Sequence, residues 1–133
     1  MKTMTKRISF GEERGQSMTE FAIVLPILVV LLFGIVQFGI LFNNYVTLTD
    51  AARAGARAAA VSRQASDPIG TTDAAVRASA SDLNQTSLGV NVSSAWTPTA
   101  PVTVTATYPY SVSLLGWIVS SGTLTTTSTE AVE

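Results

Sequence analysis

The chain has 133 residues, with no cysteine and no histidine. Disulfides, zinc sites built from cysteine or histidine, and catalytic arrangements that need a histidine are therefore excluded. The formal net charge is −1, and the length suits one membrane segment followed by one small domain.

Residues 1–15 have a net positive charge and are predicted to form a flexible leader. Four basic residues stand there against two acidic ones, whereas the remainder holds four arginines against seven acidic residues, a net charge of −3. Positive charge before a membrane segment keeps the N-terminus in the cytoplasm, so we expect the C-terminal part outside the inner membrane. A weakly acidic exterior part gives no support for nucleic-acid binding, which favours a basic surface.

An apolar run extends from Phe21 to Phe42, and no charged residue occurs between Glu20 and Asp50. A helix needs roughly 20 apolar residues to cross a hydrocarbon core of ~30 Å, and this run supplies them. Pro26 lies near its start and can kink the helix. An unpaired carboxylate at a membrane edge is costly, so Glu20 calls for a partner.

Two glycines and one glutamine interrupt the run of apolar side chains. Gly34 and Gly39 are narrow places where another helix could approach, although their spacing is not Gly-x-x-x-Gly. Gln37 is a polar group at membrane depth. Its amide either bonds a neighbouring helix or faces its own backbone.

The segment RGQSMTEFAIVLPILVVLLFGIVQFG, followed by DAARAGARAAAV, resembles the TadE-like pseudopilins of tight-adherence (Flp-type) pilus systems. Within it, Gly15, Glu20 five positions later and Phe21 look like a prepilin peptidase site. The resemblance covers residues 14–63 well and the C-terminal half only by pattern. It implies a cut between Gly15 and Gln16, which makes Glu20 the fifth residue of the mature chain.

The resemblance also implies a function, a location and partners. The size of the chain favours a minor pilin or pseudopilin, because major Flp pilins are little more than the helix and this chain carries an exterior domain. A main filament subunit stays open as the alternative. The expected partners are a prepilin peptidase, other pilin subunits, the pilus assembly platform and membrane lipid, and no cofactor is implied. Glu20 would pair with the terminal amine of Gln16, in its own or a neighbouring chain. The protein would remain in the bacterial inner membrane or enter a surface pilus.

Three other interpretations compete with this one. A cleaved secretory signal would have a shorter apolar region, with a small-residue site directly after it. An uncleaved single-pass anchor could display the exterior domain as a binding module, with Glu20 as an interfacial residue. A small envelope enzyme is disfavoured, because no catalytic carboxylate pair or phosphate-binding loop is recognisable and Asp67, Asp73 and Asp82 do not match a calcium loop.

Helical character continues beyond the run, so one helix is predicted over residues 16–65. Ala51, Gly55 and Ala59 share one face, and Ala52, Ala56 and Ala60 form the adjoining stripe. Small residues every four positions let helix backbones approach closely. The stripe is therefore either a packing surface or part of a solvated alanine-rich helix with good intrinsic propensity.

Residues 66–133 are predicted to form a small α+β exterior domain. Proline and glycine in 67–70 indicate a turn, and a short helix is expected from Thr72 to about Leu83. Alternation of apolar and polar residues over 102–112 predicts a half-buried strand, with further strands near 88–92 and 122–132. Pro109 lies on the polar face of the middle strand and indicates an edge or a strand end.

The segment Leu114–Val119 (LLGWIV) is apolar but too short to span a membrane. Three interpretations stay open for it. It could be part of the core, an interface patch, or a loop that dips into lipid.

Overall fold

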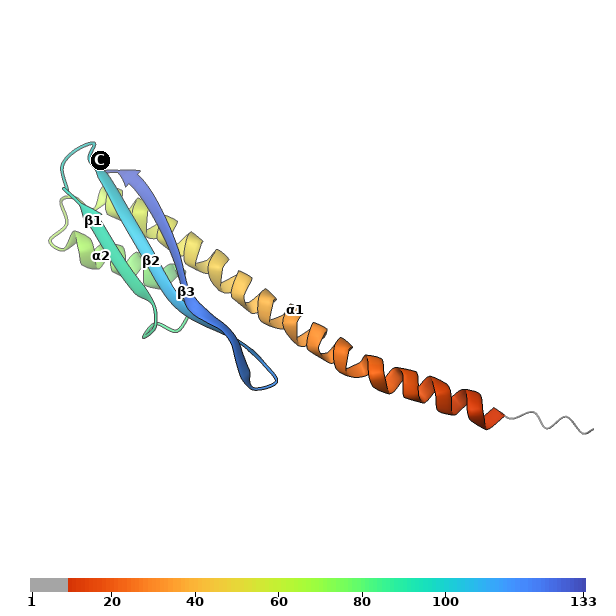
Figure 1. The fold of residues 1–133 in the computed structure, drawn as a ribbon. Coiled ribbons are helices and arrows are strands. Elements are labelled where there is room, and N and C mark those ends of the chain that lie inside the picture. Colours follow the sequence, from red (N-terminus) through yellow and green to blue (C-terminus); the bar gives the residue numbers. More distant parts are fainter. Residues whose placement is uncertain (1–9) are drawn as a thin grey trace, which may run out of the picture. The chain divides into compact units, whose positions relative to one another are not determined.

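The computed structural model describes residues 10–133, with side chains described from residue 15 onward (Figure 1). Its elements, in chain order, are α1 (Phe10–Val61), α2 (Pro68–Ser79), β1 (Gly89–Ser94), β2 (Pro101–Leu114) and β3 (Trp117–Ala131). A long apolar helix is followed by a short helix and three antiparallel strands. The predicted α+β class is therefore confirmed.

The helix α1 begins earlier than predicted. The sequence was expected to be a flexible leader up to Gly15, but the backbone from Phe10 onward is helical. Once an apolar segment has formed a helix, each added residue gains a hydrogen bond without a new nucleation cost. Glutamate has a good intrinsic helix propensity, and residues 12 and 13 of this extension are both glutamates. The predicted leader residues 1–9 lie outside the described residues.

The chain divides into two compact units, and the boundary falls within α1. The first unit ends at Val36, and the second is Gln37–Glu133. Every residue of the hydrophobic core lies in the second unit. The first unit contributes only exposed or half-buried apolar side chains among the described residues.

The helix α2 starts where a turn was predicted. Asp67 is its N-cap and accepts a hydrogen bond from the backbone N–H of Gly70 at 2.9 Å, while Pro68 takes the first helical position. Proline is well suited to that position, because the N–H that it lacks would have no helical partner there. The prediction of a turn through 67–70 with a helix starting at Thr72 is thus wrong, and the helix ends at Ser79 rather than near Leu83.

The sheet has the order β1-β2-β3, with both pairs antiparallel. The pairing of β1 with β2 ends at Gly89 and Thr107, whereas β2 and β3 continue as a two-stranded hairpin to Leu114 and Trp117. Pro109 lies inside β2, in the stretch where no described strand pairs with its second side. The prediction of an edge at Pro109 is confirmed, because a proline cannot donate to a ladder and is tolerated where one side is unpaired.

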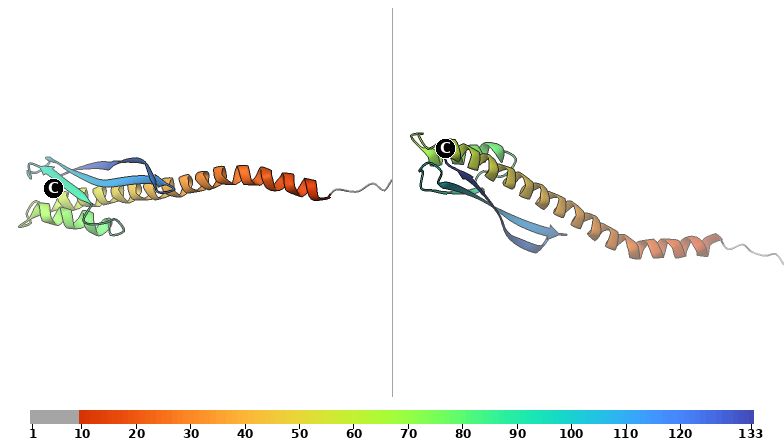
Figure 2. Two further views of the ribbon diagram at one scale, coloured as in Figure 1. Left: turned by 60° about the horizontal axis from the view of Figure 1, so that its bottom comes forward. Right: turned by 90° about the horizontal axis from the view of Figure 1, so that it is seen from above.

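Both helices lie on one face of the sheet, and the core forms between these two layers (Figure 2). Alternate residues of β2 point into it, and Val102, Val104 and Ala106 are fully buried. The opposite face presents threonines, two pairs of which are in hydrogen-bond contact across β2 and β3. The period-two pattern therefore identified the buried face of the middle strand correctly.

The alanine stripe of α1 belongs to this core. Ala51, Ala52, Ala56 and Ala59 are completely buried. Of the two interpretations of this stripe, the solvated alanine-rich helix is wrong, because the small side chains face the chain's own second unit. Small residues are required here because α2 and β2 both approach the backbone of α1.

The end of the chain fastens β3 to the last turn of α1. The backbone N–H of Glu133 donates to the carbonyl of Ala60 at 2.9 Å, and Arg63 Nε donates to the carbonyl of Glu133 at 2.9 Å. Val132 N–H donates to the Ala100 carbonyl at 2.9 Å, directly before β2 begins. The first residues of β2 therefore lie at the level of the C-terminal end of α1.

Candidate functional site: the processing segment and the membrane helix

The predicted processing residues lie within the first turns of α1. Gly15 and Gln16 are exposed and helical. The Gly15 carbonyl, which belongs to the predicted scissile bond, accepts a hydrogen bond from Thr19 Oγ1 at 2.9 Å. A cut at this bond requires the turn to open. Glycine lowers the cost of opening, because it is less favourable than alanine in a helix by about 1 kcal/mol.

Glu20 already has a partner in the uncut chain. Gln16 Nε2 donates to Glu20 Oε1 at 3.0 Å, one helical turn away on an exposed face. The two residues predicted to interact after cleavage are therefore neighbours before it, through the glutamine side chain rather than a terminal amine. Phe21, the other predicted assembly residue, is 60% exposed.

Apolar side chains that follow Glu20 are unprotected by the chain itself. Each residue from Phe21 to Leu28 is exposed, and an 18-residue window of this helix has a mean hydropathy of 2.8 with none of it buried. Among the described residues, one helix is long and apolar enough to cross a membrane. Such a helix fits a membrane anchor, because its apolar surface would otherwise stay in contact with water.

The predicted helix-packing residues divide into two groups. Gly34 and Gly39 have open space around them, since a Cβ built on either meets no atom within 4 Å. Gly55 is buried, and a Cβ built on it would meet side chains of Val76 and Val104. Ala51, Gly55 and Ala59 thus pack within this chain, whereas no other described part of the chain packs on Gly34 or Gly39.

Gln37 has a partner that sequence reasoning missed. Its Nε2 donates to the backbone carbonyl of Ser113 in β2 at 3.1 Å. Neither a neighbouring helix nor its own backbone is needed to satisfy this amide. The partner is 76 positions away in the sequence, and no local pattern indicates such a pair.

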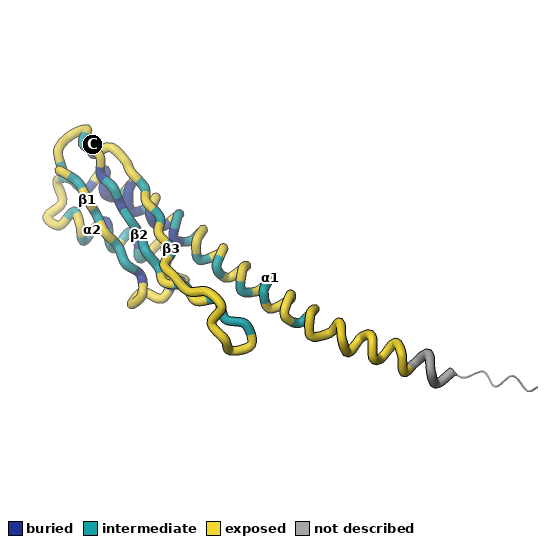
Figure 3. The backbone as a smooth tube through the Cα atoms, in the orientation of Figure 1, coloured by how far each residue is buried: buried dark blue, intermediate teal, exposed yellow. Residues whose placement is uncertain are grey.

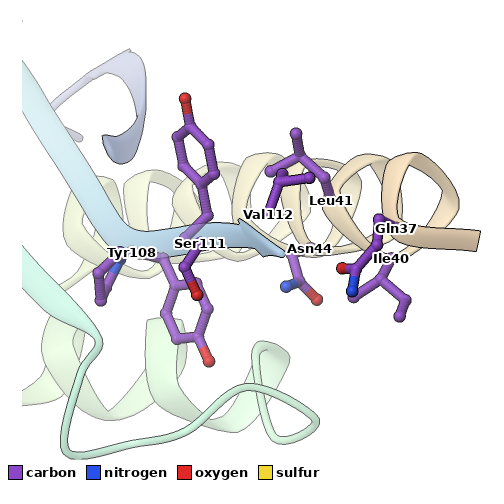
Figure 4. A pocket seen from close by; sticks show the side chains of 9 residues that line it. Gln37, Ile40, Leu41, Asn44, Tyr108, Ser111 and Val112 are labelled. Atoms are coloured by element: carbon purple, nitrogen blue, oxygen red, sulfur yellow. The ribbon is translucent and has the colours of Figure 1, made fainter. Parts of the chain in front are cut away.

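A cleft lies beside this contact, between α1 and β2 (Figure 4). Its volume is about 200 Å³, and its lining includes Gln37, Leu41 and Asn44 of α1 and Ser111 and Val112 of β2. None of the lining residues is charged. Within the part of the chain that the structure describes, no three His, Cys, Asp or Glu side chains come together as metal ligands, and the titratable side chains in the lining of the cleft are those of Tyr108 and Tyr110.

The segment Leu114–Val119 forms the tip of the β2–β3 hairpin. Four of its side chains are largely exposed: Leu115, Trp117, Ile118 and Val119. Of the three interpretations of this segment, membership of the core is therefore wrong. The strands β2 and β3 that carry this tip extend past the ends of β1 and α2, and those two elements contribute to the core only in the rest of the second unit.

The comparisons with known proteins agree with these features of the N-terminal half. Residues 15–57 match the family model of TadE-like proteins. No curated protein and no solved structure gives a match to the chain. The TadE-like segment begins at Gly15 and includes Glu20, the exposed apolar run and Gly55. The expected resemblance is thus confirmed over these residues, and it indicates a protein associated with Tad pili.

Proposed function

We propose that this chain is a minor pilin or pseudopilin of a tight-adherence pilus, cut between Gly15 and Gln16 by a prepilin peptidase. The observation that carries this proposal is the TadE-like match over residues 15–57, which starts at the glycine of the predicted site and continues through the apolar helix. In this proposal the N-terminus lies in the cytoplasm, and the second unit lies outside the inner membrane. The chain itself is a structural subunit and not an enzyme.

Cleavage changes the electrostatics around Glu20. A new N-terminus at Gln16 adds a charged amine and unpaired N–H groups at the positive end of the helix dipole. A carboxylate one turn along is favoured there, and Gln16 and Glu20 are already within contact distance through the side chain. Opposite charges in a poorly solvated environment attract strongly enough to offset part of their desolvation. The same amine could equally be supplied by a neighbouring subunit in the stack.

The exposed apolar helix supplies the driving force for assembly. In the membrane its side chains are covered by lipid, and in a filament they would be covered by helices of other subunits. Most of its large apolar side chains from Phe21 to Phe42 are 42–67% exposed, and Val29 and Leu41 are half-buried, so the chain itself leaves most of this surface uncovered. The open space at Gly34 and Gly39 would allow those helices to approach closely.

The test is the intact mass and N-terminal sequence of the protein from membranes, with and without the peptidase. We expect a mature start at Gln16 that is lost without the enzyme. Gly15→Asp should block the cut, whereas Gly11→Asp, which adds the same charge four positions earlier, should leave it unchanged. A Gly15→Asp chain that is still shortened to Gln16 would rule out this assignment.

Glu20→Gln separates assembly from cleavage. We expect the variant to be cut normally but to be lost from sheared surface filaments or from the assembly complex, because the neutral amide cannot pair with an amine charge. Glu13→Gln removes the same charge from the leader and should assemble like the native chain. Recovery of the native chain in sheared filaments would identify a filament subunit, and recovery only in membranes would identify an assembly accessory.

An uncleaved membrane anchor is the second candidate. The observation in its favour is that the Gly15–Gln16 bond lies inside a helical turn with a Thr19 contact to its carbonyl. In this case the second unit, with its own core, would be a displayed binding module. A chain that still begins at Met1 in the presence of active peptidase would favour this candidate.

A further inference from the structure

The tip of the β2–β3 hairpin is an apolar surface that the chain does not cover. Leu115, Trp117, Ile118 and Val119 are 67%, 81%, 71% and 63% exposed, and Figure 3 shows the end of this hairpin as mainly exposed. Contiguous exposed apolar residues on a small domain mark contacts with a partner or a membrane. Trp117 is the most exposed of the four, and tryptophan is enriched where membranes meet water.

The turn at the tip has an unusual residue. Leu114 pairs with Trp117, and the two residues between them, Leu115 and Gly116, have φ angles of 52° and 87°. Two positive φ angles are those of a type I′ turn, in which asparagine, aspartate or glycine normally takes the first position. Leucine is strained in that conformation. Residues held in strained backbone conformations cluster at binding sites and switch regions.

The position of the tip along α1 identifies the contact. At the start of β2, the neighbouring Val132–Glu133 segment is bonded to Ala60 of α1, and near the end of β2, Ser113 is bonded to Gln37. At ~1.5 Å per residue, the part of α1 from Gln37 to Ala60 is about 35 Å long. At ~3.3 Å per residue, β2 from its start to Ser113 is about 40 Å long, so β2 runs back along α1. The turn therefore lies at the level of Gln37.

Gln37 belongs to the apolar run that ends at Phe42. At ~1.5 Å per residue it lies about 8 Å inside the end of that run. A membrane helix can be as short as about 17 residues, which places Gln37 near the outer boundary of the hydrocarbon core. The tip reaches this boundary without bringing a charge, because no charged residue occurs between Asp82 and Glu130.

We infer that the hairpin tip Leu114–Val119 docks on the outer surface of the same bilayer that holds α1, with Leu115, Trp117 and Ile118 in contact with phospholipid. This inference rests on the proposed membrane anchoring of the chain. The insertion is shallow, because the outer backbone groups of a two-stranded hairpin have no partner in hydrocarbon and need water or headgroups. Gln37 holds the hairpin at this depth through Ser113. The apolar run of α1 and the hairpin tip are then two separate attachments of the chain to the same bilayer.

The chain contains two tryptophans, which allows a direct test. Trp96 packs against the core, next to Ser94, which pairs with Val102 at the opposite end of β2. The full chain with Trp96→Phe is reconstituted in phosphatidylcholine vesicles with bromine on the acyl chains near the carbonyl. We expect the emission of Trp117 to fall strongly relative to vesicles of unbrominated lipid, and to fall less when bromine is near the terminal methyl.

The matched control is Trp117→Phe, which leaves only Trp96 and should show little quenching by either lipid. If Trp96→Phe fails to fold, the quenching of Trp117 by bromolipid is obtained from the difference between the native chain and Trp117→Phe. Quenching of Trp117 by aqueous iodide instead of by bromolipid would overturn the inference and identify a free tip. Emission shielded from both quenchers would also overturn it and identify a second copy or another protein as the occupant.

The membrane anchoring is measured on the same vesicles by resistance to alkaline washing. A chain that resists washing but shows no quenching of Trp117 contradicts the docking of the tip alone. A chain that washes off contradicts both the tip and the anchor. The cut at Gly15 is tested separately by the N-terminal sequence, so failure of the processing proposal is distinguishable from either result.

Discussion

Gly55 of α1 lies so close to Val76 of α2 that a Cβ built on the glycine would overlap the valine Cγ2 atom. Val104 of β2 approaches the same point, and a Cβ would lie 3.3 Å from its Cγ1 atom. This one position therefore sets how closely both α2 and the sheet approach α1. It also lies within the TadE-like segment, in the part of α1 that packs in the core of the second unit.

Gly55→Ala should destabilise the second unit despite the better helix propensity of alanine. The propensity gain is about 1 kcal/mol, whereas overpacking a filled core costs roughly 1–3 kcal/mol. Val76 cannot rotate away easily, because a β-branched residue in a helix has one strongly preferred rotamer. We expect a net loss of about 1 kcal/mol in the free energy of unfolding. Denaturant unfolding of the full chain in detergent, followed by near-UV circular dichroism, measures this loss.

Gly39→Ala is the control, because no atom lies within 4 Å of a Cβ at that position. It should leave the stability of the second unit unchanged or raise it slightly. The double variant Gly55→Ala/Val76→Ala should recover part of the overlap cost, which appears as a coupling energy in a double-mutant cycle. Strict additivity of the two single effects would contradict the proposed contact.

Asp67→Ala should weaken the start of α2. The carboxylate accepts the N–H of Gly70 at 2.9 Å, and removal of such a cap costs about 1 kcal/mol. Asp67→Ser keeps an oxygen that can accept the same bond and should be close to the native chain. The readout is the free energy of unfolding of the full chain in detergent. Equal losses for alanine and serine would show that the cap is not what stabilises this turn.

Local patterns predicted the parts of the fold that depend on neighbours in the sequence. The alternation over 102–112 identified β2 and its buried face, and the apolar run identified the one described helix that is long and apolar enough to cross a membrane. The start of α2 was missed because Asp67, Pro68 and Gly70 are equally good turn residues. Their role as a cap and a first turn depends on the helix that follows.

The fate of the apolar residues at 114–119 could not be predicted, because it depends on strand lengths. An apolar stretch of this kind is usually core. Here β2 and β3 pair for several residues after β1 has ended, so nothing remains to cover the tip. For the same reason the Gln37–Ser113 contact was missed, since it requires knowledge of where β2 ends along α1.

Gln37→Ala should loosen the free half of the hairpin. Beyond Thr107 the hairpin has two strands, and isolated two-stranded hairpins are marginally stable. Loss of the hydrogen bond to Ser113 removes about 1 kcal/mol of support. We expect faster amide exchange over 110–120 and unchanged exchange over 102–106, measured by mass spectrometry on the full chain in vesicles. Asn44→Ala, in the lining of the same cleft, is the control. Unchanged exchange over 110–120 in the Gln37 variant would contradict a tethering role.

Leu115→Asn separates the stability of the turn from its contact with lipid. Asparagine before glycine is a preferred type I′ sequence, and relief of a strained leucine is worth about 1 kcal/mol. We therefore expect slower amide exchange in the hairpin of the full chain in detergent. In vesicles the same variant loses an apolar side chain from the tip, so bromolipid should quench Trp117 less than in the native chain.

Leu114→Asn is the matched control for this pair of measurements. Leu114 pairs with Trp117 and stands in a strand, where asparagine is disfavoured, so both hairpin protection and quenching should fall. In the Leu115 variant hairpin protection should rise while quenching of Trp117 falls, and in the Leu114 variant both should fall. This combination is expected only if the leucine in the turn is retained for a contact outside the chain. If Leu115→Asn leaves quenching unchanged while protection rises, the leucine has no role in the membrane contact, and the docking surface is reduced to Trp117 and Ile118.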